Sequence, residues 1–167
     1  MDLPATLLEA VRYFSDIDRC EAFLRKLRWP TGTIRCPECN STNIGEVKTR
    51  RLLQCRDCRR QIYTKRGTIL EDSPLGLDKW FVAVWCIANC KNGISSHELA
   101  RALGIQQKSA WFMLHRIRTA MEIDGGDKFH SLLKRVVAVP KDKVDARMAE
   151  KESVERLRII APVHPNR

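Results

Sequence analysis

The chain has 167 residues, a length that holds one domain with a buried core but excludes a large enzyme with accessory domains. Apolar residues make up 44% of it, as in ordinary folded proteins, whereas 30 Lys and Arg against 20 Asp and Glu leave a formal charge of +10. This excess predicts a polyanionic partner. The sequence has neither an apolar run near the ~20 residues that span a bilayer nor a basic leader after Met1, so we expect a cytoplasmic protein without membrane contacts.

The first 30 residues predict two short helices. Thr6 precedes an apolar pattern over residues 7–14, and its hydroxyl is suited to cap a helix. Ser15 or Asp16 opens a second helix, which ends before Trp29 and Pro30.

Residues 31–70 lack the helical period and contain short apolar runs, such as 51–54 and 61–64, between turn residues. Short strands are therefore expected. The same segment holds the pattern Cys-x2-Cys-x15-Cys-x2-Cys, formed by Cys36, Cys39, Cys55 and Cys58. Two such pairs can give one zinc ion a tetrahedral shell of thiolates with no open position for catalysis. We predict a zinc ribbon with one structural Zn2+ ion; four unrelated buried cysteines are the alternative.

The other three cysteines, Cys20, Cys86 and Cys90, lie outside this pattern. Cys86 and Cys90 are one helical turn apart, but no His or carboxylate at a suitable spacing completes a second metal site. Because free cysteine is a common small core residue, we expect all three to be buried in the core.

Residues 71–122 have the pattern of a helical unit. A turn-rich linker at 71–74 leads into a helix over 78–90 that is apolar on nearly every side, as expected for a buried central helix. Ser95, with Glu98 three residues later, has the spacing of a capping box and opens a short helix. That helix ends at Gly104, and a further helix over 106–122 follows, with an apolar stripe of Ala110, Leu114, Ile117 and Met121.

Beyond residue 122 the pattern is less regular. Residues 124–127 break the chain, residues 129–137 are patterned as one more amphipathic helix, and the highly charged remainder from Lys141 is expected to be loosely held. Together the patterns predict an α+β chain that is mainly helical. Its expected parts are N-terminal helices (1–30), a zinc ribbon of short β-hairpins (31–70), a helix-turn-helix unit (71–122), and a C-terminal helix with a charged tail (123–167).

A dense run of basic residues covers the second half of the ribbon. Between Val47 and Arg66 there are eight basic residues and a single acid, Asp57. On a hairpin held by zinc these side chains can follow a phosphate backbone, whereas the alternative is a solvated face that only promotes solubility. The predicted DNA contacts in the ribbon are Lys48, Arg50, Arg51, Arg56, Arg59, Arg60, Lys65 and Arg66.

The helix over 106–122 has a predicted outer side. At about 100° per residue, its apolar stripe directs five other side chains away from the core: Lys108, Phe112, His115, Arg116 and Thr119. The start of such a helix is where helix-turn-helix proteins approach base edges, and no acid lies between Leu99 and Met121. Phe112 could contact a thymine methyl group or pack against the C-terminal helix, and the whole pair could be a purely structural hairpin. The predicted DNA contacts here are Gln107, Lys108, Ser109, His115 and Arg116.

Several motifs resemble those of zinc-ribbon insertion-sequence transposases, a family of DNA-transposing enzymes. They are Trp29-Pro30-Thr31-Gly32, Cys36-Pro37-Glu38-Cys39, Cys55-Arg56-Asp57-Cys58, Gly67-Thr68-Ile69, Asp72-Ser73-Pro74-Leu75, Lys79-Trp80, Gly93-Ile94-Ser95-Ser96 and the run from Lys108 to Arg118. The resemblance covers residues 16–122. It implies a DNA-binding ribbon followed by a helical DNA-binding unit.

In that family a nuclease domain of RNase H type follows, with spaced acidic residues that bind two divalent metal ions. Here 45 residues follow Glu122, too few for such a domain, and their acids fall in charged helical patterns. Residues 129–146 resemble the C-terminal tail of some family members, which favours an internal deletion. The resemblance therefore implies no catalytic residues and no enzymatic activity for this chain.

The sequence thus predicts a transposase-related protein that binds double-stranded DNA, such as terminal inverted repeats, without cutting it. We expect it to associate with the nucleoid when bound to DNA, and to compete with an intact transposase, form homo-oligomers or join mixed assemblies. The alternatives are a small transcription regulator built from the same two modules and a zinc-ribbon module that binds protein.

Overall fold

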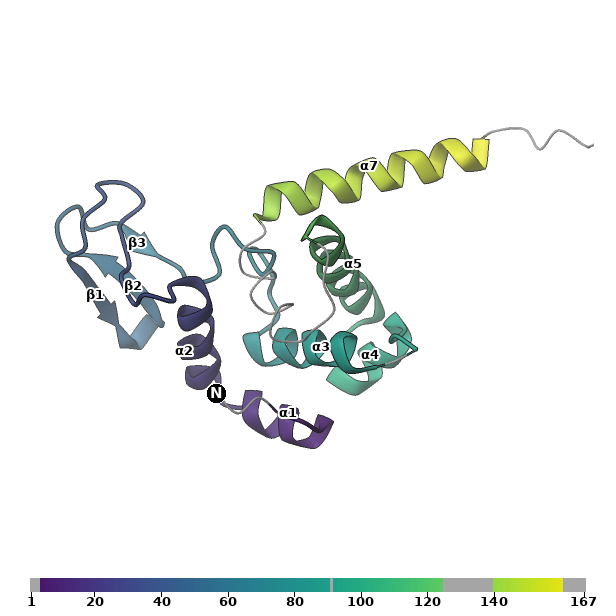
Figure 1. The fold of residues 1–167 in the computed structure, drawn as a ribbon, viewed down its shortest axis with the longest axis horizontal. Helices are drawn as coiled ribbons and strands as arrows, with labels where there is room; N and C mark the ends of the chain where they lie inside the picture. The colour runs from purple at the N-terminus through teal and green to yellow at the C-terminus, as the bar shows by residue number, and fades with distance from the viewer. Residues whose placement is uncertain (1–3, 91, 125–139, 161–167) are drawn as a thin grey trace, which may run out of the picture.

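The computed structural model describes residues 4–90, 92–124 and 140–160 (Figure 1). The α+β, mainly helical class is confirmed. In chain order the elements are α1 (Leu7–Phe14), α2 (Ile17–Arg28), β1 (Ile44–Val47), a 3-10 turn (Lys48–Arg50), β2 (Leu52–Cys55), β3 (Gln61–Ile62), α3 (Leu77–Asn89), α4 (Ser96–Leu103), α5 (Gln107–Asp124) and α7 (Lys141–Ile160). No helix among the described residues is both long and apolar enough to cross a bilayer.

The first two helices begin at residues that the sequence predicts as caps. The Thr6 hydroxyl accepts the backbone N–H of Glu9 at 3.3 Å, and the Glu9 carboxylate accepts the N–H of Thr6 in return, which completes a capping box. Of the two candidates for α2, Asp16 is the cap, because its carboxylate accepts the N–H of Asp18 at 2.9 Å. Ser15 instead ends α1.

The ribbon is a three-stranded antiparallel sheet in the order β1-β2-β3. Ile44 lies opposite Cys55 in the first pair, and Leu53 lies opposite Ile62 in the second. The predicted strand at 51–54 is confirmed with a shift of one residue, as β2, and the one at 61–64 is confirmed in shortened form, as β3. Leu52, Leu53 and Ile62 are the buried aliphatic side chains of these strands, so the ribbon has little apolar core of its own.

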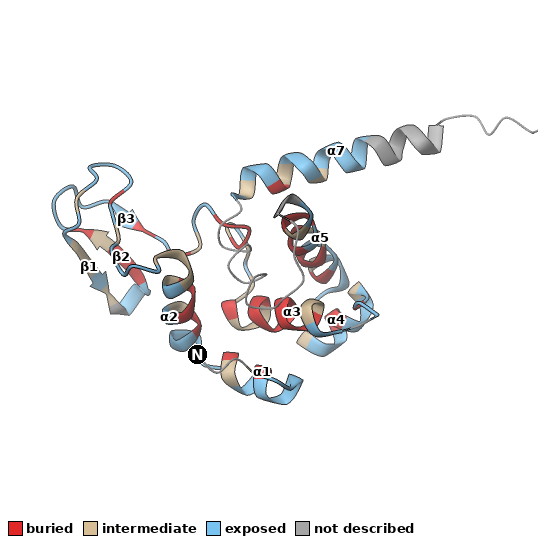
Figure 2. Ribbon diagram, in the orientation of Figure 1, coloured by how far each residue is buried: buried red, intermediate tan, exposed pale blue. Residues whose placement is uncertain are grey.

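Helix α3 is the centre of the helical part, and Figure 2 shows it buried over most of its length. All seven residues from Trp80 to Cys86 are buried, as the apolar pattern predicts. The rings of Phe14 on α1 and Phe23 on α2 lie 5.1 and 5.4 Å from that of Phe81, centroid to centroid. The N-terminal helices thus pack on the same core as the rest of the helical unit.

The pair α4 and α5 forms as predicted, with a sharp turn between the helices. Ser95 accepts the N–H of Glu98 at 3.2 Å at the start of α4. Gly104 ends α4 in the left-handed conformation, with φ of 61°. A β-carbon at Gly104 would meet no atom within 4 Å, so the backbone conformation, and not lack of space, is what favours glycine there.

Helix α5 is buried over a wider arc than its apolar stripe predicts. Ala110, Leu114 and Ile117 are at most 2% exposed, as expected. Two residues predicted to face outward, Arg116 and Thr119, are instead 4% and 1% exposed, so that prediction is wrong. Helix α7 packs across α5 (Figure 1), and Arg116 is also covered by the segment that leaves the ribbon, through its bonds to the carbonyls of Ile69 and Glu71.

Helix α7 also corrects the expectation of a loosely held segment after Lys141, because residues 141–160 form a helix of 20 residues. Its Val144 is fully buried and Met148 packs against the core. The predicted amphipathic helix at 129–137 lies outside the described residues.

A buried arginine joins three parts of the fold. One guanidinium nitrogen of Arg116 donates to the carbonyls of Ile69 and Glu71, each at 2.9 Å. The other lies 3.6 Å from a carboxylate oxygen of Asp145 on α7, and the guanidinium lies over the Phe112 ring, 4.5 Å from its centroid. Arg116 therefore holds the segment that leaves the ribbon against both α5 and α7.

We expect Arg116→Met to lower the free energy of unfolding by about 3 kcal/mol, because it leaves buried carbonyls without donors. Urea unfolding of the zinc-loaded protein, followed by the fluorescence of its buried tryptophans, measures this loss. Arg101→Met, at an exposed position on α4, is the matched control and should change the free energy of unfolding by less than about 0.5 kcal/mol. Equal losses in the two variants would contradict the structural role of Arg116.

Candidate metal centre and nucleic-acid interface

The four predicted cysteine ligands come together in the ribbon. All four sulfur atoms lie within 4.8 Å of one another, with 3.5 Å between Cys36 and Cys58 and 3.6 Å between Cys39 and Cys55. Sulfurs held about 2.3 Å from a tetrahedral zinc ion lie about 3.8 Å from one another. The cluster therefore fits one structural Zn2+ ion, and four thiolates fill its shell.

The backbone of each Cys-x2-Cys turn folds in the same way. The residue after the second cysteine, Asn40 in the first turn and Arg59 in the second, has a positive φ, of 57° and 60°. The N–H of Asn40 donates to the carbonyl of Cys36, and that of Cys55 donates to the carbonyl of Arg60, both at 2.9 Å. Asparagine tolerates this conformation, whereas arginine adopts it at some cost in free energy.

Asp57, the single acid in the basic run, links the two cysteine turns. Its carboxylate accepts the side-chain amide of Asn43 at 2.9 Å and the hydroxyl of Ser41. These donors hold the pKa of Asp57 below its usual value, the Ser41 hydroxyl having the larger effect and the Asn43 amide the smaller. Asp57 is therefore a structural residue of the metal centre.

The peptide groups of the first turn favour the charged form of a ligand. Hydrogen bonds from the backbone N–H groups of Cys39 and Glu38 lower the pKa of Cys36 to about 7. A thiolate is the form that binds zinc, so these two N–H groups favour coordination by Cys36.

The cysteines outside the pattern have different environments. Cys20 is fully buried and Cys86 is 3% exposed, and burial raises the pKa of these thiols to about 12 and about 11. Both are core residues, as predicted. Cys90 ends α3 and is exposed, so its expected place in the core is wrong.

Helix α2 is attached to the ribbon by polar contacts. Arg25 pairs with Glu46 on β1 at 2.7 Å, and Asp18 pairs with Arg51 at 2.7 Å. Arg28 donates to the carbonyl of Thr64, also at 2.7 Å. Because α2 packs on α3 as well, it connects the metal-bearing sheet to the helical core.

Three of the predicted ribbon contacts, Arg50, Arg56 and Arg59, are exposed and have no acidic partner within ion-pair distance in the part of the chain that is described. Arg51, Arg60 and Arg66 are also exposed, but each lies near an acid; Arg60 is 3.7 Å from Glu38 and Arg66 is 3.9 Å from Glu71. Exposed pairs of this kind contribute little to stability and exchange easily for a phosphate. The Lys48 side chain lies outside the described part of the structure.

Lys65 does not fit its predicted role. Its ammonium group donates to the carbonyl of Leu75 at 3.1 Å, and burial lowers the pKa of Lys65. The side chain supports the segment that leaves the ribbon, so it is not free to contact a phosphate, and the prediction is wrong.

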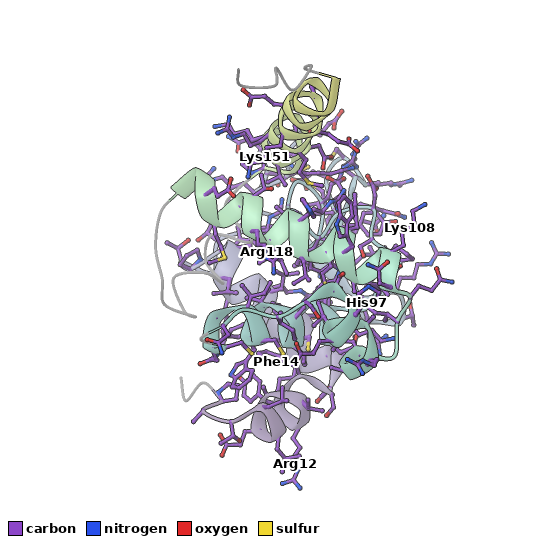
Figure 3. All side chains as sticks on the ribbon, turned by 90° about the vertical axis from the view of Figure 1, so that its right-hand side faces the viewer. Arg12, Phe14, His97, Lys108, Arg118 and Lys151 are labelled. Carbon is purple, nitrogen blue, oxygen red and sulfur yellow. The ribbon has the colours of Figure 1, made fainter. Side chains whose placement is uncertain are left out.

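The start of α5 carries the second predicted interface. Lys108 is exposed and lies at the outer edge of the molecule in Figure 3. Gln107 is exposed as well, with its amide donating to the Ser96 hydroxyl at 2.9 Å, and Ser109 is half-buried. Side chains at this end of α5 are therefore accessible from solvent.

The remaining two predicted contacts on α5 have other environments. The His115 ring lies 4.1 Å from that of Trp111, and burial, together with the nearby cations Arg118 and Lys151, lowers the pKa of His115. Arg116 is bound to backbone carbonyls in the core, so its assignment as a DNA contact is corrected.

The sequence pattern predicted that Phe112 faces outward but missed the exposure of its neighbour Trp111. The two side chains are 42% and 43% exposed, respectively. The two neighbouring aromatic residues lie off the apolar stripe, which was the available signal. Lys108, Trp111 and Phe112 fall at i, i+3 and i+4, so they share one side of the helix.

Comparison with known proteins identifies the ribbon. Residues 16–61 match the family described as the transposase zinc-ribbon domain. The chain carries a transposase zinc-ribbon domain. The matched segment of this domain includes α2, β1, β2 and all four cysteines, in keeping with the contacts that attach α2 to the sheet.

The chain is also similar to a protein from Halobacterium salinarum described as an uncharacterized protein in transposable element ISH50. The two are 26% identical over 115 residues, which cover 67% of this chain and 38% of the relative. The chain therefore aligns with well under half of that protein's length. No solved structure matches the chain. Among the described residues, the four cysteines are the one group of three or more His, Cys, Asp or Glu side chains close enough to share a metal ion. No cluster of acidic side chains of this kind is found in the same residues.

We expect Cys39→Ser to reduce the zinc content from one ion per chain to less than a tenth of that, because three thiolates cannot close the shell. Metal analysis of the dialysed protein measures the content, and hydrogen exchange of the amides in β1 and β2 measures the accompanying loss of order. Cys90→Ser, at the exposed end of α3, is the control and should retain one ion. Full zinc content in Cys39→Ser would show that these cysteines are not the ligand set.

Proposed function

We propose that this chain is a DNA-binding protein of the insertion-sequence transposase type, which binds duplex DNA at the ends of a transposable element. The observation that carries the proposal is a set of exposed arginines on the metal-bearing hairpin that have no acidic partner among the described residues: Arg50, Arg56 and Arg59. The transposase zinc-ribbon match and the similarity to a transposable-element protein support the same class of partner.

The spacing of these arginines suits a phosphate backbone. Arg50 lies two residues before β2 and Arg56 directly after it, and the strand itself is about 13 Å long at the usual rise per residue. Since duplex DNA carries one charge per ~1.7 Å of its axis, side chains at both ends of the hairpin can contact phosphates along one groove edge. Such contacts fix the position of the protein and carry no sequence information.

The start of α5 supplies the proposed sequence preference. Lys108 is exposed, has no acidic partner among the described residues, and lies in the first turn of the second helix of a helix-turn-helix arrangement. A lysine there can donate to the acceptors of guanine in the major groove, and Gln107 can bond adenine. We therefore assign base contacts to α5 and phosphate contacts to the ribbon.

We further propose that these 167 residues bind element ends without cutting them. The zinc shell of four thiolates is closed, and the acids of the described residues form no cluster that could hold two divalent ions. A chain with these properties competes with an intact transposase for the same DNA, or joins it in a mixed assembly.

Arg59→Ala and Lys108→Ala separate the two kinds of contact. Loss of Arg59 should weaken all duplexes by a similar factor, of about three- to tenfold, and lower the slope of log affinity against log salt by about 1. Loss of Lys108 should instead reduce discrimination between bound and unrelated sequences by about 1–3 kcal/mol. Alanine has the same penalty as arginine at the positive φ of residue 59, so the first variant should keep its fold.

Titrations of each variant against a selected and an unrelated duplex, over a range of salt, measure both effects. The selected duplex comes from enrichment of bound fragments out of random DNA with the zinc-loaded protein. Enrichment of inverted-repeat sequences supports the proposal, whereas promoter sequences would favour a transcription regulator. A protein that binds no duplex even at low salt would refute DNA binding altogether.

Strand cleavage is tested separately. With Mg2+ or Mn2+ present, the zinc-loaded chain should leave the selected duplex intact over hours, on a gel that resolves single nicks. Cleavage that survives repeated purification would overturn the non-cutting role while leaving the binding proposal in place.

A further inference from the structure

An apolar cavity opens beside the start of α5, between this helix and the segment that leaves the ribbon. Its volume is about 250 Å³. Three aromatic side chains, Trp80, Trp111 and Phe112, contribute to its wall, together with Pro74, Leu75 and Met113. Lys108 also lines it, so a free cation lies beside an aromatic surface.

The aromatic rings of this cavity are fixed by their neighbours. The indole N–H of Trp80 donates to the Ser73 hydroxyl at 3.0 Å. The Arg116 guanidinium lies 4.5 Å from the centroid of the Phe112 ring, and the Trp111 and His115 rings are 4.1 Å apart. Rings that are already ordered lose little conformational entropy when a ligand stacks on them.

The exposure of the two α5 rings needs a physical reason. Trp111 and Phe112 are 43% and 42% exposed, and adjacent exposed aromatic residues usually mark a binding surface. The acid that lines the cavity, Asp72, is paired with Lys141, and Lys108 has no acidic partner in the part of the chain that the structure describes. The surface therefore favours a flat apolar group that is attached to a negative charge.

A nucleobase on its phosphodiester backbone has this chemistry. Pockets for drug-sized ligands measure about 300–1,000 Å³, so a cavity of about 250 Å³ suits a single base. Stacking on aromatic side chains is how proteins hold unpaired bases, while a cation binds the neighbouring phosphate. A base within an intact duplex cannot enter, because its faces are covered by the bases above and below.

We propose that this cavity binds one unpaired nucleobase of DNA, stacked against Phe112 and Trp111. The inference rests on the proposed DNA binding and adds a substrate class to it, duplex DNA with an unpaired base beside the bound site. The chain then binds duplexes with frayed or extended ends in preference to blunt ones.

The test compares a blunt duplex with the same duplex carrying a short single-stranded extension, both titrated with the full zinc-loaded chain. The extended duplex should bind about tenfold more tightly. A 2-aminopurine base in the extension should lose fluorescence on binding, as stacked 2-aminopurine does. Phe112→Leu and Trp111→Leu should each bring the affinity ratio close to one and leave the affinity for the blunt duplex unchanged.

Tyr63→Leu is the matched control, because Tyr63 is an aromatic residue of similar exposure, 47%, that does not line this cavity. It should keep the tenfold preference. Circular dichroism checks the fold of each variant. Because the Phe112 ring contacts the buried Arg116 guanidinium, the Trp111 variant tests the inference even where the Phe112 variant is unstable.

Three results would overturn the inference. Equal affinity of the wild type for the two duplexes refutes the base site and leaves the proposed duplex binding intact. Absence of binding to either duplex refutes both. Self-association of the DNA-free chain that is lost in Trp111→Leu would show that the cavity is instead covered by a second copy.

Discussion

Closure of four thiolates around one metal ion is the constraint on which the ribbon depends. Its strands bury three aliphatic side chains, Leu52, Leu53 and Ile62, and its longest strands have four residues each. A sheet of this size is marginal in water without further support. Zinc coordination supplies free energy on the order of 10 kcal/mol, enough to hold the left-handed backbone at Arg59 and to bring two distant cysteine turns together.

The connection between ribbon and helices depends on a different interaction, a buried cation that satisfies backbone carbonyls. Arg116 holds the carbonyls of Ile69 and Glu71, while Lys65 holds that of Leu75. Both side chains belong to the basic residues that the sequence predicted to face solvent and contact DNA. Together with the contacts of α2, they attach the metal-bearing sheet to the helical core. The proposed phosphate contacts on the ribbon and base contacts on α5 are therefore held at a fixed distance and orientation from each other.

The positive charge of this chain therefore has two uses. Arg28, Lys65 and Arg116 donate inward to carbonyl oxygens, where a long side chain replaces water as the donor. Arg50, Arg56, Arg59 and Lys108 remain in solvent with no acidic partner among the described residues. The formal charge of +10 thus overstates the charge available to a polyanion. The exposed cations of the described residues include those on the ribbon and at the start of α5.

The sequence by itself determined the local features. The cysteine spacing specified the metal ligands, the caps Thr6, Asp16 and Ser95 specified helix starts, and Gly104 specified a turn, because each depends on residues close along the chain. Only the tertiary structure decided which polar residues of α5 stay exposed. The burial of Arg116 depends on the carbonyls of Ile69 and Glu71 and on Asp145 of α7, a helix whose charged sequence gives little helical period. Packing between distant segments, and not the pattern within one helix, sets which cations remain free to bind a partner.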